Sequence, residues 1–344
     1  MKQVYTIILA FLITASATAQ DIHYSQFFNA PLLLNPALTG FTSGEYRVAA
    51  DYRNQWFSAT GLGFGKSPFM TSAASFDMPI HIRNDALGVG LVLMDDQAGA
   101  NTFSTLMACA SVSYIITLGK KQHQRLSAGF EAGYTDETIF PQNFQWASQF
   151  DNNMFNSALP TNENLLKTHV GYLNLNGGLF WYGKFNEHLG IYAGGSFFNI
   201  STPKFDVIAG QSRDLYWRYN THAGVDIILG KKYHILPSLM YMSQGPDNQM
   251  NVGIGFGDDF TETMMLTAGI YSRFNTLTVG ANPDAMIPYV AFDLRGVKLG
   301  ISYDVTISTL KNSGSMVGAL EMTVTYTPKG KHYNPRTALI APRF

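Results

Sequence analysis

The fold is decided by the stretch Val297-Lys298-Leu299-Gly300-Ile301-Ser302-Tyr303-Asp304-Val305-Thr306. Its odd-numbered positions are apolar or aromatic, and its even-numbered positions are polar, charged or glycine. Because successive side chains of a strand point to opposite faces, this alternation predicts a strand with one apolar and one polar face. A length of about ten residues is what a tilted strand needs to cross a bilayer.

The same alternation recurs along the chain, and helical periodicity is absent over any long window. The pattern predicts an all-β fold, a transmembrane antiparallel β-barrel of about fourteen strands. The predicted strands cover residues 45–56, 69–78, 86–94, 103–117, 125–135, 173–184, 188–199, 217–229, 233–243, 249–257, 262–273, 286–294, 297–306 and 316–327.

The lengths of the connections give an independent signal. Long segments such as 137–172, 200–216 and 274–285 alternate with short ones such as Asn186-Glu187 and Arg295-Gly296. Outer-membrane barrels have short periplasmic turns and long external loops. The alternation therefore predicts an even number of strands and places both termini in the periplasm.

Composition supports this class. The chain is 46% hydrophobic but only 14% charged, whereas a soluble domain carries about 25% charged residues. After residue 20 there is no apolar run of about 18 residues, which disfavours a helical membrane protein. The net charge of -1 argues against a nucleic-acid partner, since phosphate binding needs a basic surface.

The N-terminus has the three parts of a secretory signal peptide. Lys2 is followed by an apolar run from Val4 to Ala15 and by the small residues Ala17-Thr18-Ala19. We expect residues 1–19 to be cleaved and the mature chain to start at Gln20. Export and a barrel together predict a location in the outer membrane, with lipid around the barrel.

Motifs for catalysis, cofactors and metals are missing. Gly61 to Ser67 imitates a phosphate loop, but Thr60 stands where the first glycine should be. The histidines are scattered without metal-ligand spacing, and Cys109 is the sole cysteine. We predict no catalytic, cofactor-binding or metal site, and hence a protein that is not an enzyme.

Residues 20–44 precede the first strand and are too apolar for a solvated tail. We expect this periplasmic N-terminal segment to brace the rim, to plug the lumen or to dock a partner protein. The candidate partner-binding residues are Phe27, Phe28, Leu32, Leu33, Leu34, Asn35 and Pro36.

Charged residues on the predicted inner face form a second candidate site. Closing the barrel brings the first strand beside the last, so charges of both signs meet in the lumen. They would form either a structural ladder of ion pairs or a selectivity constriction. The candidate lumen charges are Glu45, Arg47, Asp51, Arg53, Asp304 and Glu321.

The chain resembles the PorP/SprF family in several blocks. They are Asp21 to Phe28, Pro31-Leu32 with Leu34 to Gly40, Tyr52 to Trp56, Gly300 to Val305 with Gly318 to Glu321, and Pro342-Arg343-Phe344. Ile22 departs from the family, which more often has proline there, and Tyr24 replaces phenylalanine. The resemblance implies an outer-membrane barrel of the Bacteroidetes type IX secretion and gliding-motility apparatus. It also implies periplasmic ring proteins, or a large secreted adhesin, as partners.

Together these signals predict one barrel domain over 45–327 and a basic periplasmic tail over 328–344. We expect a non-enzymatic component that couples the outer membrane to its partners. The alternative is a diffusion porin or uptake channel, which the mixed charges of the lumen favour but which leaves the apolar N-terminal segment unexplained.

Overall fold

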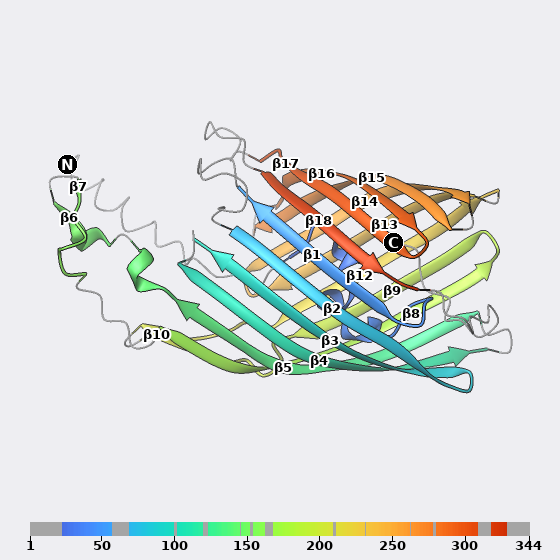
Figure 1. Cartoon of the computed structure of the whole chain (residues 1–344), viewed down its shortest axis with the longest axis horizontal. Coiled ribbons are helices and arrows are strands. Elements are labelled where there is room, and N and C mark those ends of the chain that lie inside the picture. Colours follow the sequence, from blue (N-terminus) through green and yellow to red (C-terminus); the bar gives the residue numbers. More distant parts are fainter. Residues whose placement is uncertain are drawn as a thin grey trace.

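The computed structural model describes residues 23–56, 69–99, 102–119, 123–144, 146–151, 154–161, 168–208, 211–230, 232–261, 263–277, 280–308 and 318–328. Their main feature is a closed antiparallel barrel of fourteen strands (Figure 1). The predicted signal peptide and almost all of the predicted tail lie outside the described residues.

All fourteen predicted strands are confirmed, most of them longer than expected. Each pairs with its neighbours along the chain, and β1 closes the barrel against β18. The barrel strands are β1 (Arg47–Gln55), β2 (Phe69–Ile82), β3 (Asp85–Ala98), β4 (Phe103–Leu118), β5 (Gln124–Ile139), β8 (His169–Asn186), β9 (Leu189–Phe198), β12 (Arg218–Leu229), β13 (Tyr233–Gln244), β14 (Asp247–Thr261), β15 (Met264–Leu277), β16 (Gly280–Leu294), β17 (Val297–Thr306) and β18 (Gly318–Tyr326).

The predicted faces of β17 are also confirmed. Leu299 and Ile301 point outward and are 49% and 56% exposed, whereas Ser302 and Asp304 point inward and are 1% exposed. Exposed apolar side chains continue around the other barrel strands. A surface of this kind is what contact with lipid requires.

The connections follow the predicted alternation at one end of the barrel, where all of them are short. Arg295 and Gly296 join β16 to β17 with φ values of 54° and 86°, as a two-residue hairpin turn requires. At the other end, the predicted long loop 274–285 is wrong. β15 continues to Leu277 and β16 begins at Gly280, because the ladder extends beyond the apolar alternation.

Two long connections carry small elements of their own. The β5–β8 connection contains η3 (Pro141–Asn143), η4 (Ala147–Gln149) and the short strands β6 (Phe150–Asp151) and β7 (Met154–Phe155). The β9–β12 connection contains the hairpin β10 (Lys204–Ile208) and β11 (Gln211–Asp214). Figure 1 shows β6, β7 and β10 beyond the strand ends, at the left of the barrel.

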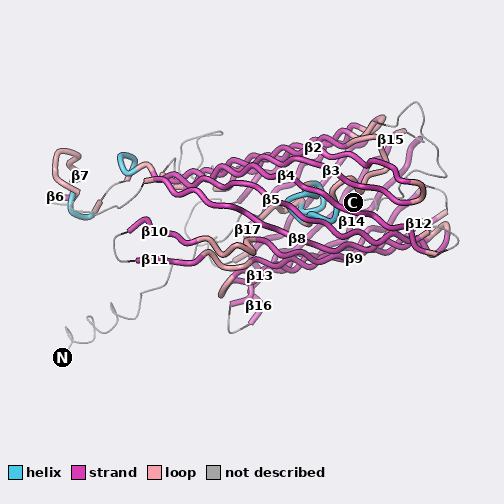
Figure 2. The backbone as a smooth tube through the Cα atoms, turned by 90° about the horizontal axis from the view of Figure 1, so that it is seen from below, coloured by secondary structure: helices cyan, strands magenta, loops and turns pink. Residues whose placement is uncertain are grey.

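Residues His23 to Gly44, here called the inner segment, lie inside the barrel (Figure 2). The segment contains η1 (Phe27–Asn29), α2 (Pro31–Leu34) and η2 (Pro36–Leu38) and contributes no strand to the wall. No helix among the described residues is long and apolar enough to cross a membrane. The core of the molecule is therefore the contact between this segment and the inner face of the wall.

The outward face of β17 yields a prediction. Ile301→Arg, near the middle of the strand, should lower the free energy of unfolding in lipid by about 2–4 kcal/mol, because it places a charge in hydrocarbon. Urea titration of the protein in liposomes measures this. Thr325→Arg is the control, since Thr325 points inward on β18 and is only half-buried. An equal loss in both variants would contradict the assignment of the faces.

Candidate functional site

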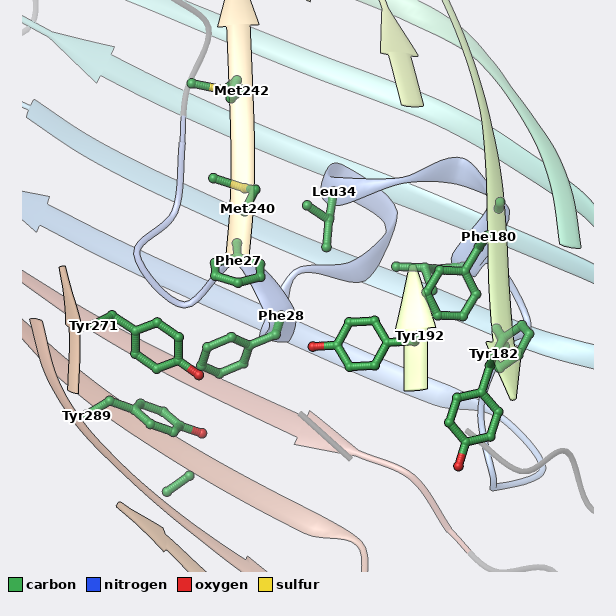
Figure 3. Close-up of a cluster of buried hydrophobic side chains, with 14 of the residues drawn as sticks. Phe27, Phe28, Leu34, Phe180, Tyr182, Tyr192, Met240, Met242, Tyr271 and Tyr289 are labelled. Atoms are coloured by element: carbon green, nitrogen blue, oxygen red, sulfur yellow. The ribbon is translucent and has the colours of Figure 1, made fainter. Parts of the chain in front are cut away.

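The aromatic pair of the inner segment is buried against the wall. Phe27 and Phe28 are 3% and 4% exposed. The ring of Phe28 lies 5.4 Å from Tyr271 and 5.2 Å from Tyr289, centroid to centroid, and Figure 3 shows the three rings beside one another. Aromatic pairs at such distances add to the gain from apolar burial. These two candidate partner-binding residues are thus not on an exposed surface.

The leucines of the segment also pack against the wall. Leu32 packs into a cluster with Val92, Met94, Met107 and Cys109, and Leu33 is half-buried against that cluster. Leu34 belongs to the larger cluster around Phe27 and Phe28. The apolar character that suggested a docking surface is therefore used inside the barrel.

Asn35 and Pro36 fix the turn between α2 and η2. The Asn35 side chain accepts a hydrogen bond from the Ala37 amide at 2.9 Å and donates to the carbonyl oxygen of Leu179 in the wall at 2.9 Å. Pro36 occupies the first turn of η2, where its missing N–H costs nothing. The Asn35 side chain thus caps η2 and attaches the segment to β8.

Five charged side chains meet near the start of the segment. Arg53 pairs with Asp304 at 2.7 Å and with Glu321 at 3.0 Å. Arg273 pairs with Asp304 at 2.8 Å and with Asp284 at 2.6 Å. Of the predicted lumen charges, the structure therefore brings Arg53, Asp304 and Glu321 together, and adds Arg273 and Asp284 from β15 and β16.

This ion-pair cluster also binds the inner segment. Glu321 accepts the backbone N–H groups of Ser25 and Gln26 at 2.8 Å and 2.7 Å. The Ser25 hydroxyl donates to Asp304 at 2.7 Å and accepts from Arg53 at 2.6 Å. The charges thus hold the segment and one another, and they do not line an open path.

The other predicted lumen charges lie apart from this cluster. Arg47 pairs with Asp77 at 2.8 Å and donates to the Leu38 carbonyl oxygen at 2.9 Å. Asp77 in turn accepts the Gly40 N–H at 2.7 Å. Glu45 precedes β1 and is exposed. Arg47 and Asp77 therefore form a second attachment, near the end of the segment.

Asp51 is buried beside Tyr24 without joining either group. Among the described residues no hydrogen bond reaches its carboxylate oxygens. Burial raises the pKa of the Tyr24 hydroxyl well above its ordinary value, and the carboxylates of Asp51 and Glu321 act in the same direction. The Tyr24 hydroxyl therefore stays protonated.

Three wall glycines form a seat that we did not identify from the sequence. A Cβ atom would come within 2.0 Å of the Thr39 carbonyl oxygen at Gly88, 2.3 Å of Pro36 at Gly129 and 2.0 Å of the Asn35 side chain at Gly178. Their periodic inward positions were visible in the alternation, but their contacts depend on where the segment lies.

Chemistry for catalysis is not apparent at this site. Within the described ranges no three His, Cys, Asp or Glu side chains gather as metal ligands would. Cys109 is buried in the apolar cluster with Leu32. What the arrangement does is bind a peptide segment inside a closed wall.

Comparison with known proteins gives a family and a fold. The family model described as type IX secretion system membrane protein PorP/SprF matches residues 16–326. No curated protein matches the sequence.

Among solved structures, the chain is similar to the CymD monoaromatic hydrocarbon channel, with a TM-score of 0.56 and 10% identity over 89% of this chain and 94% of that chain. The deltaS2S3 mutant of the TodX monoaromatic hydrocarbon channel gives a TM-score of 0.54 and 10% identity over 88% and 94%. At this identity the likeness shows the barrel fold alone.

The glycine seat yields a prediction. Gly129→Ala forces the inner segment to shift by placing a methyl group against its backbone, and should destabilise the segment by about 1–3 kcal/mol. Hydrogen exchange of residues 33–40 measures the loss. Gly255→Ala is the matched control, because the nearest atoms to its Cβ would belong to Leu236 and Thr267, at 3.5 Å or more. Equal exchange in the two variants would contradict the seat.

The ion-pair cluster yields a second prediction at this site. Arg53→Met should cost about 3–5 kcal/mol in unfolding free energy, because it leaves the buried Glu321 carboxylate without its arginine and Asp304 with Arg273 alone. Adding Glu321→Gln should recover part of this loss by removing one of those charges. Urea titration of both variants in liposomes tests the order. A double variant no more stable than the single one would show that charge is not the cause.

Proposed function

Because the chain belongs to the PorP/SprF family of type IX secretion system membrane proteins, we propose that it couples the outer membrane to partners of that system. The partners are periplasmic ring proteins or a large secreted adhesin. The protein acts without catalysis, as a membrane-embedded binding component. The family match over residues 16–326 is the observation that carries this proposal.

The filled lumen supports a binding role over free diffusion. The inner segment crosses the interior and is attached to β1, β2, β8, β17 and β18 by hydrogen bonds. Neither the matched family nor the similar solved structures are enzymes.

We place the contact with ring proteins at the end of the barrel with the short turns, which we assign to the periplasm. Lys232 is exposed there in the β12–β13 turn, and the chain continues from Pro328 into a tail with Lys329, Lys331, Arg336 and Arg343. Since Lys232 pairs with Asp258 at 3.4 Å, the basic charge comes mainly from the tail. A basic tail suits an acidic partner, because opposite charge guides the encounter. Phe27 and Phe28 are inside the barrel, so a partner using them must reach into the lumen or draw the segment out.

Truncation after Pro328 tests the periplasmic contact. The barrel should still assemble, since β18 ends at Tyr326, but recovery of ring proteins from cross-linked cells should fall several-fold and secretion should drop. Charge guidance also predicts weaker recovery from the intact protein at high salt. Normal recovery and secretion by an assembled truncated barrel would overturn this contact.

The alternative function is a diffusion porin or uptake channel. It draws on the fold likeness to CymD and TodX, which are described as monoaromatic hydrocarbon channels. Conductance of the pure protein in planar bilayers separates the two functions. The filled lumen leads us to expect no steady open pore, and a stable open conductance would favour the channel.

A further inference from the structure

The wall binds the backbone of the inner segment with its side chains. Three hydroxyls donate to segment carbonyl oxygens: Ser196 to Leu34 at 2.8 Å, Ser127 to Ala37 at 2.7 Å and Ser113 to Thr39 at 2.6 Å. Arg47 donates to Leu38 O, while Glu321 and Asp77 accept from the backbone N–H groups of Ser25, Gln26 and Gly40. These hydrogen bonds are made to the peptide backbone, so they do not depend on the side chains of the peptide.

The wall also binds many side chains of the segment. Ser25 hydrogen-bonds Asp304 and Arg53, Gln26 donates to Ser302, Asn29 donates to Thr323, and Thr39 hydrogen-bonds Ser111. Tyr271 and Tyr289 receive the Phe27 and Phe28 rings, and the Leu179 carbonyl receives Asn35. The glycine seat at Gly88, Gly129 and Gly178 brings the peptide against the strands. The site thus fits an irregular peptide with an aromatic pair followed by Asn-Pro and small residues.

The strand ladder of the barrel closes without a strand from the segment. β1 pairs with both β2 and β18, and the strand order returns on itself through barrel strands alone. The hydroxyls and carboxylates that hold the segment can be hydrated if it leaves, since water satisfies the same groups. The wall therefore binds the segment as it would bind a peptide ligand.

From these contacts we infer that the lumen is a peptide-binding site with two ligands that compete. The resident ligand is the inner segment, and the second is a peptide of the secreted partner with the same chemistry. The wall groups that bind the peptide backbone accept any sequence, and the contacts to side chains then select peptides that share the side-chain chemistry of the inner segment. This inference rests on the proposed function and names the site at which the secreted partner is bound.

Binding in trans tests the site. A barrel lacking residues 23–42 should bind a fluorescent synthetic peptide of residues 23–42 saturably. Gly129→Ala in that barrel should weaken binding at least about tenfold, while Gly255→Ala should not change it. If the shortened barrel does not assemble, exchange of the labelled peptide onto the intact protein gives the same readout. No saturable binding, or equal effects of the two glycine variants, would refute the site.

A reversible cross-link tests the exchange. The hydroxyls of Thr39 and Ser111 are 2.6 Å apart, so Thr39→Cys with Ser111→Cys brings two thiols within disulfide reach. The parent carries Cys109→Ala, because Cys109 lies two residues from position 111. The oxidised variant should lose secretion down to the level of a strain lacking the gene, and reductant should restore it. Each single-cysteine variant shows the effect of losing the Thr39–Ser111 hydrogen bond alone.

The outcomes separate the two proposals. Normal secretion with the disulfide fully formed would show that the segment is a permanent part of the wall and would overturn the exchange, while the proposed function would stand. Normal secretion in the strain lacking the gene would instead overturn the proposed function itself. Recovery on reduction, seen only in the double variant, supports the exchange.

Discussion

An irregular peptide enclosed by a barrel must find partners for its backbone groups among the side chains of the wall. Strands satisfy their own N–H and C=O groups in the ladder, but the inner segment has only short helical turns and no ladder. An unpaired buried backbone group costs as much as a lost hydrogen bond. The hydroxyls of Ser113, Ser127 and Ser196 and the carboxylates of Asp77 and Glu321 meet this requirement.

The same requirement accounts for the buried charges. Arg53, Asp304 and Glu321 are at most 3% exposed, and a buried ion pair by itself is weak evidence for stability. Here Glu321 and Asp304 each serve both an arginine and the segment, through Ser25 and Gln26. Charge is compensated and peptide groups are satisfied by the same atoms, which ties closure of the wall between β1 and β18 to the position of the segment.

Local pattern was sufficient to predict the wall. The alternation in 297–306 and its repeats predicted every barrel strand, and it assigned Arg53, Asp304 and Glu321 to the inner face. Their meeting also followed from closure, since Arg53 lies opposite Glu321 in the β1–β18 register.

The position of the inner segment inside the barrel could not be predicted from local sequence pattern. The sequence around Phe27 and Phe28 is the same whether these side chains pack inside the barrel or bind a partner. Apolar character alone does not say which surface the side chains contact. Arg273 and Asp77 join the site through registers set by several strands, and Gly129 matters only because Pro36 lies against it. Such contacts depend on where the segment lies among fourteen strands, which no period in the sequence encodes.

The side chains that line the lumen indicate which kind of molecule the barrel could bind. A diffusion pore needs an open polar path, whereas this interior pairs its charges with one another and turns its hydroxyls toward carbonyl oxygens. The aromatic pocket of Tyr271 and Tyr289 and the glycine seat suit a chain of peptide units rather than a small solute. Within a family of secretion components, an interior that binds peptide groups is suited to holding a protein segment. If it does so, as we propose, the inner segment limits access by occupying that place itself.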